Sequence, residues 1–238
     1  GKDYVARYRH RGSAEAAAAV AAMAAHVPLE GVHVLDVACG AGRHIPPLLA
    51  YGAAHVTGLD LSRALLEFAE EDLRPDVAAG RVRLVVGDMR QLPFDHETFD
   101  VVTSFFTSFG YFSTDQENAV VLQEIARVLR PGGRFVLDFF HAATTIARLV
   151  SNETTYENGE RLEINRWFDS STRRIEKRVL GPQGDERVRE SVRAFTPTEL
   201  VDLAARAGFA LVQALGHYDG TAFDPASSPR YIGIFVRS

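Results

Sequence analysis

The stretch Val34-Leu35-Asp36-Val37-Ala38-Cys39-Gly40-Ala41-Gly42 passes from an apolar run into a turn built of small residues. Residues 43–51, which follow it, are predicted to form a helix. Small residues let main-chain amides at a helix start come close to a ligand, and the helix dipole favours a carboxylate or phosphate there. The stretch therefore predicts a strand, a ligand-binding turn and a helix in succession.

The turn by itself also suits a dinucleotide, and two residues separate the alternatives. The fingerprint G-x-G-x-x-G requires a third small residue where this chain, counted from Gly40, has Ile45. Asp36 stands just before the turn, where its carboxylate would repel a pyrophosphate but attract an ammonium group. A ligand that carries both an ammonium and a carboxylate fits this turn better than a nicotinamide dinucleotide.

The composition predicts one globular domain. The chain has 238 residues, of which 46% are hydrophobic and 24% charged, so a substantial core can form. The net charge of -5 gives no overall attraction to a phosphate backbone, which argues against nucleic acid as a partner. The single cysteine, Cys39, cannot form an internal disulfide, which fits a reducing cytoplasm. The sequence contains no Cys/His cluster, so no metal site is predicted.

Residues 1–30 allow two interpretations. Three arginines followed by the alanine-rich residues 14–25 resemble a signal peptide in outline. Glu15 and the preponderance of alanine favour instead an amphipathic cap helix that begins at Ser13 as its capping residue. No apolar stretch reaches the length of about 20 residues that a membrane span needs, so we expect no membrane partner.

Short apolar runs alternate with helical segments through the first 140 residues. Each run is apolar throughout, as expected for parallel strands that are buried on both sides. The pattern predicts a parallel sheet with helices on both faces, and Pro131-Gly132-Gly133 is expected to end the last helix and start the last strand. The predicted strands are residues 32–37, 55–60, 82–87, 99–105 and 133–140, and the helices between them are residues 43–51, 62–73 and 114–129.

Residues 151–195 have a different texture and predict an antiparallel β insertion. Three strands are expected, at residues 161–169, 172–180 and 186–195, with Gly181-Pro182-Gln183-Gly184 as the turn between the last two. Basic and acidic residues nearly balance here, which favours a solvated flap or a dimer contact over a phosphate groove. A helix at residues 197–207 and strands at residues 209–215 and 231–236 complete the chain.

Acidic residues end three successive predicted strands. Asp60 can accept both hydroxyls of a ribose, as acids do at this place in dinucleotide-binding folds, and Asp88 can accept an adenine amino group. Leu61 and Met89 would cover the faces of the adenine ring. Each acid alone could be a helix N-cap or a turn residue. Together with Asp36 they lie at one crevice, which predicts a ligand containing a nucleoside.

These segments resemble those of class I S-adenosylmethionine (SAM) dependent methyltransferases in order and spacing, at residues 34–42, 58–62, 87–89, 99–102 and 128–133. The resemblance implies a Rossmann-like, doubly wound, mostly parallel seven-stranded sheet with one antiparallel strand, plus the small β insertion. It implies SAM as cofactor and S-adenosylhomocysteine as product. The residues expected to contact the cofactor are Tyr8, Asp36, Ala38, Gly40, Gly42, Asp60, Leu61, Asp88, Met89 and Ser104. Ala38 departs from the family, which often has glycine there.

The aromatic residues 105–112 follow the fourth predicted strand and lack the Asn/Asp-Pro-Pro-Tyr motif of nucleic-acid amino methyltransferases. Together with residues 87–90 and the strand-rich insertion, they resemble bacterial small-molecule N- and O-methyltransferases, including aminosugar dimethyltransferases. Tyr111 and His141 are the candidate catalytic residues, as a base for an acceptor that loses a proton. Core packing for Tyr111 and helix capping for His141 are the structural alternatives.

The function predicted is methyl transfer from SAM to an N or O atom of a small-molecule acceptor, mainly through proximity and orientation. A monomer or homodimer in the cytoplasm is expected. The alternatives are a tRNA or protein methyltransferase, a non-catalytic SAM-binding sensor or scaffold, and a nicotinamide oxidoreductase.

Overall fold

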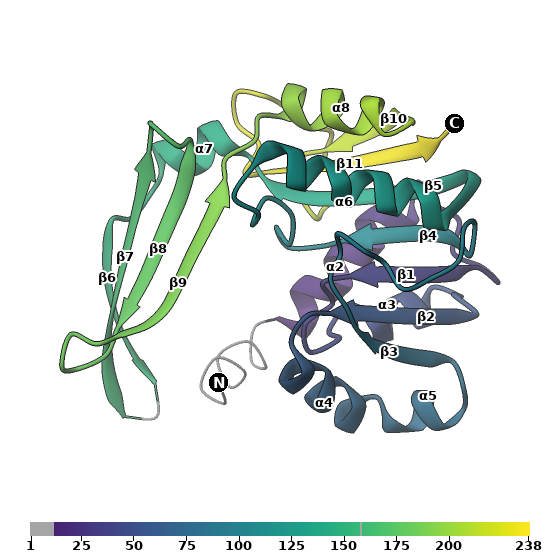
Figure 1. The fold of residues 1–238 in the computed structure, drawn as a ribbon, viewed down its shortest axis with the longest axis horizontal. Helices are drawn as coiled ribbons and strands as arrows, with labels where there is room; N and C mark the ends of the chain where they lie inside the picture. The colour runs from purple at the N-terminus through teal and green to yellow at the C-terminus, as the bar shows by residue number, and fades with distance from the viewer. Residues whose placement is uncertain (1–11, 158) are drawn as a thin grey trace.

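The computed structural model describes residues 12–157 and 159–238, which form two β-sheets and the helices around them (Figure 1). Within these residues the larger sheet has seven strands in the order β10-β11-β5-β4-β1-β2-β3. Strand β11 is antiparallel to both of its neighbours, and the other neighbouring strands are parallel. The Rossmann-like fold with one reversed strand is thereby confirmed. The strands are β1 (His33–Val37), β2 (His55–Asp60), β3 (Val82–Val86), β4 (Phe99–Ser104), β5 (Leu129–Phe140), β10 (Phe209–Leu215) and β11 (Arg230–Arg237).

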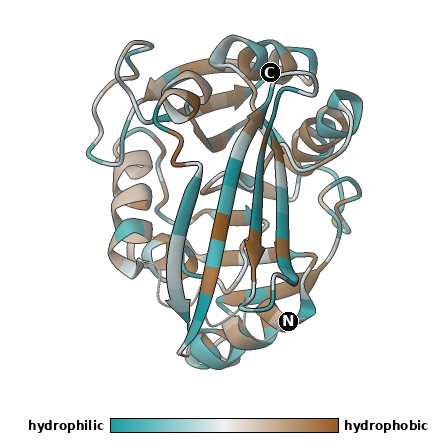
Figure 2. Ribbon diagram, turned by 90° about the vertical axis from the view of Figure 1, so that its left-hand side faces the viewer, coloured by the Kyte–Doolittle hydropathy of each residue, from teal (hydrophilic) through white to brown (hydrophobic). Residues whose placement is uncertain are grey.

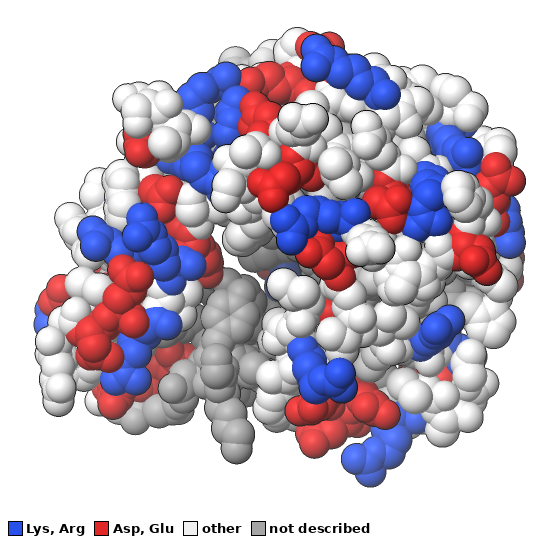
Figure 3. All heavy atoms as spheres, viewed as in Figure 1, with Lys and Arg blue, Asp and Glu red and all other residues white. Residues whose placement is uncertain are grey.

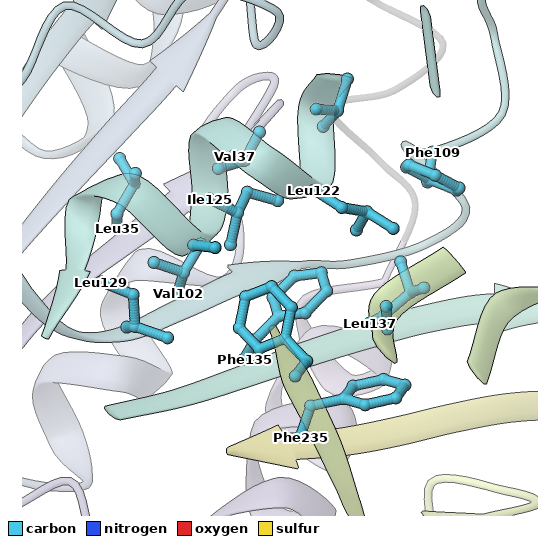
Figure 4. Packing of buried hydrophobic residues seen from close by; sticks show 14 of the residues in the cluster. Leu35, Val37, Val102, Phe109, Leu122, Ile125, Leu129, Phe135, Leu137 and Phe235 are labelled. Atoms are coloured by element: carbon cyan, nitrogen blue, oxygen red, sulfur yellow. The ribbon is translucent and has the colours of Figure 1, made fainter. Parts of the chain in front are cut away.

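Two hydrophobic cores lie on the two faces of this sheet. Helices α6 (Asp115–Val128) and α8 (Pro197–Arg206) cover one face, and α2 (Ser13–Ala24) and α3 (Ile45–Ala50) cover the other. Successive strand residues point to opposite faces, so Leu35 packs in the α6–α8 core and Val34 in the α2–α3 core. Figure 4 shows Leu35, Val102 and Phe135 packed against Ile125 of α6.

The helix boundaries follow local capping chemistry. The N-cap residues of helices α6 and α8 are Thr114 and Thr196, each of which forms a capping box with a glutamate three residues later. The expectation that Ser13 caps α2 is wrong, because Gly12 holds the N-cap position and Ser13 is the first helical residue. The remaining helices are α4 (Arg63–Asp72), α5 (Arg74–Ala78) and α7 (Ala142–Ala147). No helix among the described residues has both the length and the apolar character needed to cross a membrane.

Two predicted boundaries differ from the structure for identifiable reasons. Helix α3 begins at Ile45, two residues later than expected, with Pro46 and Pro47 in its first turn, where a missing N–H costs little. Strand β5 begins at Leu129 instead of Gly133. Its pairing with β4 shifts register there, so Pro131 and the two glycines after it lie in an irregular part of the strand rather than ahead of it.

The smaller sheet is antiparallel and has the order β6-β7-β8-β9 within the described residues. Its strands are β6 (Asn152–Glu157), β7 (Glu160–Asp169), β8 (Arg174–Leu180) and β9 (Glu186–Arg193). Strand β6 was not predicted, because it is a polar edge strand without alternating apolar residues. Figure 2 shows long hydrophilic stretches along these strands with short hydrophobic ones, and Figure 3 shows acidic and basic side chains interspersed.

Candidate active site

The carboxyl ends of the parallel strands meet at one edge of the seven-stranded sheet. Strand β1 lies between β4 and β2, so the residues after Val37 are flanked by the ends of both neighbours. In Figure 1 the four-stranded sheet stands on this side of the larger sheet. Ligands of open α/β sheets bind outside the carboxyl ends of the strands, where the strand order reverses. This edge is therefore the candidate site.

The turn after β1 uses three residues with left-handed backbone conformation, namely Ala38, Gly40 and Gly42, with φ of 58°, 58° and 76°. Glycine adopts this conformation without strain, whereas Ala38 adopts it at a cost. A Cβ atom at Gly42 would lie 3.2 Å from the Cβ of Ala69. A Cβ at Gly40 would meet no atom within 4 Å. Gly42 therefore serves helix packing, while the space beside Gly40 is open to a ligand.

Asp36 is the buried acid beneath this turn. Its side chain is 1% exposed, and its Oδ1 accepts a hydrogen bond from the Thr103 hydroxyl at 2.9 Å. Its Oδ2 is buried and has no hydrogen-bond partner among the described residues. Burial raises the pKa of Asp36 to about 7, although Thr103 and the charge of Arg43 act to lower it. Such an oxygen is suited to an ammonium group, which would supply both a hydrogen bond and a compensating charge.

Asp60 closes the turn from the end of β2. Its Oδ2 accepts a hydrogen bond from the main-chain N–H of Gly40, and its Oδ1 accepts one from that of Ser62, both at 2.8 Å. Each carboxylate oxygen has further lone pairs, so Asp60 can still accept hydrogen bonds from a diol. Leu61 beside it is 73% exposed, so its side chain is free to cover an aromatic base.

Asp88, after β3, has a partner that sequence reasoning did not foresee. Its Oδ2 lies 2.7 Å from an Nη atom of Arg90, and this hydrogen bond is the main cause that holds the pKa of Asp88 below its usual value. Arg90 also pairs with Glu117 at 2.8 Å. An adenine amino group would therefore share Asp88 with Arg90. Met89 is partly buried against the α6–α8 core.

Comparison with known proteins agrees with this geometry. The family described as "Methyltransferase domain" matches residues 34–133. The chain is 34% identical over 170 residues to the demethylmenaquinone methyltransferase of Clavibacter sepedonicus, covering 64% of this chain and 66% of that protein. It is 42% identical over 120 residues to the cypemycin N-terminal methyltransferase of a Streptomyces species, covering 50% and 46%. The chain thus spans about half to two thirds of the length of these two relatives.

Residues 34–133 match the methyltransferase domain family, and the chain resembles SAM-dependent methyltransferases along most of its length. Among solved structures, the CcbJ methyltransferase of Streptomyces caelestis shares the fold with a TM-score of 0.78 at 22% identity, over 94% of this chain and 95% of that one. SAM-bound CalS10, an amino pentose methyltransferase of Micromonospora echinaspora, gives 0.69 at 27% identity, over 99% and 96%. The cofactor of this methyltransferase family is SAM, and its ammonium group would suit the Asp36 oxygen that has no hydrogen-bond partner in the described part of the chain.

The other predicted site residues occupy different environments in this chain. Ser104 is buried at the end of β4, and Tyr111 is 46% exposed. His141 is buried after β5, and its Nδ1 lies 2.9 Å from the main-chain oxygen of Ser228 and 2.9 Å from the hydroxyl of Thr144. A catalytic role for Tyr111 or His141 stays a prediction. Tyr8 lies outside the described residues.

Two further residues of the turn region are structural in their contacts. His44 is buried and stacks on Phe105 with ring centroids 4.3 Å apart. Burial, together with the charge of Arg43, lowers the pKa of His44 to about 3. Burial also raises the pKa of the Cys39 thiol. Neither side chain has the protonation state that acid–base or nucleophilic chemistry would use.

Sequence reasoning missed a buried charged cluster at the end of β5. Asp138 is fully buried, and its Oδ1 accepts a hydrogen bond from Arg230 Nε at 2.6 Å. Its Oδ2 accepts hydrogen bonds from the Tyr218 hydroxyl at 2.6 Å and from the main-chain N–H of Phe106 at 2.8 Å. The available signal was an acid inside an apolar strand, two residues before its end, since such a charge needs partners.

Proposed function

We propose that this chain transfers a methyl group from SAM to an N or O atom of a small-molecule acceptor. The observation that carries the proposal is the buried Asp36 carboxylate, whose Oδ2 lacks a hydrogen-bond partner among the described residues. It lies beneath a turn in which the space beside Gly40 is open. When bound there, SAM supplies a methyl group that its sulfonium already activates for displacement.

The residues that would hold the cofactor divide by the part of SAM they meet. Asp36 would bind the ammonium group, and main-chain N–H groups of the turn at Gly40 and Gly42 would meet the carboxylate. Asp60 would accept hydrogen bonds from the ribose hydroxyls. Asp88, Leu61 and Met89 would surround the adenine. We propose that Ala38 and Ser104 line the same space.

The chain's contribution to the transfer is to hold and desolvate the acceptor, because the methyl group needs no further activation. A base is required only where the acceptor must lose a proton. Tyr111 and His141 are the candidates. For His141, the contact of Nδ1 with the Ser228 carbonyl assigns the ring proton to Nδ1 and leaves Nε2 as the basic nitrogen.

The aromatic segment after β4 supports a modest organic acceptor. Phe105 and Phe109 are buried in the two cores. The residues left to form a wall are Phe106, Tyr111 and Phe112, none of which is fully buried. Relatives are named for O-methylation and for C-methylation, so the identity of the acceptor atom must come from the product.

Calorimetric titration with SAM and S-adenosylhomocysteine tests the cofactor site. We expect dissociation constants in the micromolar range. Loss of one hydrogen bond to a charged group costs about 1.5–3 kcal/mol, so Asp60→Ala should weaken both ligands at least roughly tenfold. Asp202→Ala, an exposed acid on α8, is the control and should bind normally. Absence of heat with either ligand would contradict the proposal.

Incubation with methyl-labelled SAM and a metabolite extract tests the transfer itself. Label in a small molecule is expected, and its position identifies the acceptor atom. A SAM-binding sensor or scaffold would bind the cofactor in the titration but transfer no label.

A peptide acceptor is a second candidate, because one relative is named as a cypemycin N-terminal methyltransferase. Label that enters a peptide fraction of the extract and not the small-molecule fraction would favour it. Transfer to bulk tRNA is not expected, because a net charge of -5 gives little counterion release on binding.

A further inference from the structure

One carboxylate joins three segments that are far apart in the sequence. Asp138 on β5 binds the turn after β4 through Phe106, the β10–β11 connection through the Tyr218 hydroxyl, and the start of β11 through Arg230. Burial by itself lowers the pKa of Arg230, yet the charge of Asp138 and the hydrogen bond to it hold that pKa above its usual value. Arg230 therefore keeps its positive charge inside the protein, where its Nε donates a hydrogen bond to Asp138.

The turn held by Asp138 has a strained backbone. Phe106 and Thr107 are consecutive non-glycine residues with φ of 53° and 64°. This left-handed conformation persists only where surrounding contacts enforce it, and it is common at functional sites. Here the main-chain N–H of Thr107 donates to the main-chain oxygen of Asp138 at 2.9 Å. The Thr107 hydroxyl accepts from the main-chain N–H of Phe140 at 3.2 Å.

The strained turn also contacts the cofactor side of the site. The guanidinium carbon of Arg43 lies 4.2 Å from the centroid of the Phe106 ring, and that of Arg230 lies 5.3 Å from it. Arg43 directly follows the glycine turn. Cation–π contacts of this kind stabilise the ring where it lies. The position of Phe106 therefore depends on both the glycine turn and the Asp138–Arg230 pair.

We propose that Asp138 is a positioning residue for methyl transfer. It holds the Phe106–Thr107 turn and the β10–β11 connection, which carries Tyr218, as two walls of the acceptor site. The inference rests on the proposed function. Asp138 itself is fully buried and so does not touch the acceptor. Its effect is on where the acceptor lies relative to the methyl group, and misplacement of a reacting atom by about 1 Å can cost roughly 100-fold in rate.

Asp138→Asn tests the proposal against the matched control Asp100→Asn. Asn keeps the size of the side chain but replaces one acceptor oxygen with a donor that faces other donors. Asp100 on β4 likewise pairs with an arginine, Arg130, and accepts from the main-chain N–H of His33, but at the opposite end of the sheet. Tyr218→Phe removes one hydrogen bond to Asp138 and serves as the milder variant, should Asp138→Asn fail to fold.

Three measurements apply to each variant: S-adenosylhomocysteine affinity by calorimetry, label transfer into a dilution series of the metabolite extract, and hydrogen exchange of residues 104–110 and 216–229. We expect Asp138→Asn to keep its affinity within about threefold but to lower the maximal transfer rate roughly 100-fold. Both segments should exchange faster. Tyr218→Phe should lower the rate by a smaller factor and speed exchange mainly in residues 216–229. Asp100→Asn should change none of these.

The outcomes separate the inference from the proposed function. Normal transfer and unchanged exchange in Asp138→Asn and Tyr218→Phe would overturn the role of Asp138. A loss of S-adenosylhomocysteine affinity as large as the loss of rate would overturn it too, since the residue would then serve the cofactor site or the fold. Absence of label transfer by the unmodified chain would contradict the proposed function instead, and the exchange data would still decide whether Asp138 holds the two segments.

Discussion

The parallel strands β1 and β4 bury almost every side chain, whereas the four antiparallel strands β6 to β9 bury few. In β1 four of five residues are buried, and in β4 five of six. The cluster within the four-stranded sheet consists of Leu162, Ile164 and Val179, with Val188 partly buried beside it. On the face seen in Figure 3, acidic and basic side chains are interspersed over these strands.

This difference in burial predicts that the two sheets differ in stability and in the part that each takes in the site. Regions with few buried apolar contacts open at lower free energy than a central core does. The Asp36 and Asp60 site lies on the seven-stranded sheet, which fixes its geometry. We expect the four-stranded sheet, hereafter the flap sheet, to open independently, as a region that admits or adjusts to an acceptor would.

The largest effect should come from truncation in the larger core. Phe135→Ala removes a fully buried ring and should lower the free energy of unfolding by about 3–5 kcal/mol. Val179→Ala, at a fully buried position of the flap sheet, should cost about 2 kcal/mol. Urea unfolding checks both, with circular dichroism for the whole chain.

Fluorescence of Trp167, the only tryptophan, separates the two sheets because it lies in β7. Val179→Ala should move the fluorescence transition more than the circular dichroism transition. If both signals shift together in both variants, the two sheets unfold as one cooperative unit and the proposed contrast is wrong.

The second effect is a pH dependence of stability, which arises from Asp36 in the larger sheet. The pKa of Asp36 rises from 3.8 to about 7 on folding because the carboxyl is buried. The folded state thus binds the proton more tightly than the unfolded state does. This contribution to stability is complete below about pH 3.8 and is lost as pH rises through about 7. The difference corresponds to roughly 4 kcal/mol.

Asp36→Asn should remove this pH dependence, which denaturant unfolding between pH 4 and pH 8 would detect. An ammonium ligand requires the ionised carboxylate, so S-adenosylhomocysteine affinity should rise with pH up to about 7 in the unmodified chain and stay flat in Asp36→Asn. A parallel pH dependence in the two proteins would show that Asp36 does not titrate in this range.

The strand ends at which we propose that the cofactor binds were predictable because they are encoded locally. The turn from Asp36 to Gly42 and the acid Asp60 each follow a short apolar run, whose length and flanking turn residues favour a buried strand. Parallel pairing then brings the strand ends together without further information. The Asp88–Arg90 ion pair could not be predicted in the same way, because side-chain pairing across a turn leaves no periodic pattern in the sequence.

The region proposed for the acceptor depends on contacts that the sequence does not reveal. Asp138 and Arg230 are 92 residues apart and meet only because β5 and β11 are neighbours in the sheet. Likewise, the polar edge strand β6 has no pattern of its own, and its pairing with β7 defines it. Charged and polar side chains acquire their structural roles from residues that are distant in the sequence. Composition alone therefore describes this region but does not predict which of its residues pair.

The smallest effect should arise where the flap sheet contacts helix α8 of the larger core, at Glu199. Its carboxylate receives hydrogen bonds from Arg173 at 2.8 Å and Arg193 at 3.0 Å, while also capping α8 through Thr196. Burial by itself raises the pKa of Glu199, but these hydrogen bonds and charges lower it to about 2. The stabilisation is therefore present above about pH 4.5 and is lost as pH falls through about 2.

Glu199→Gln keeps a side chain that can still cap α8 but removes the charge that both arginines share. At pH 7 we expect a loss of about 1–2 kcal/mol in the free energy of unfolding, larger by Trp167 fluorescence than by circular dichroism. The loss should shrink toward zero as the pH falls from 4.5 to 2. Asp202→Asn on the same helix should have no such effect. Equal shifts in both signals would mean that Glu199 stabilises α8 alone and does not anchor the flap sheet.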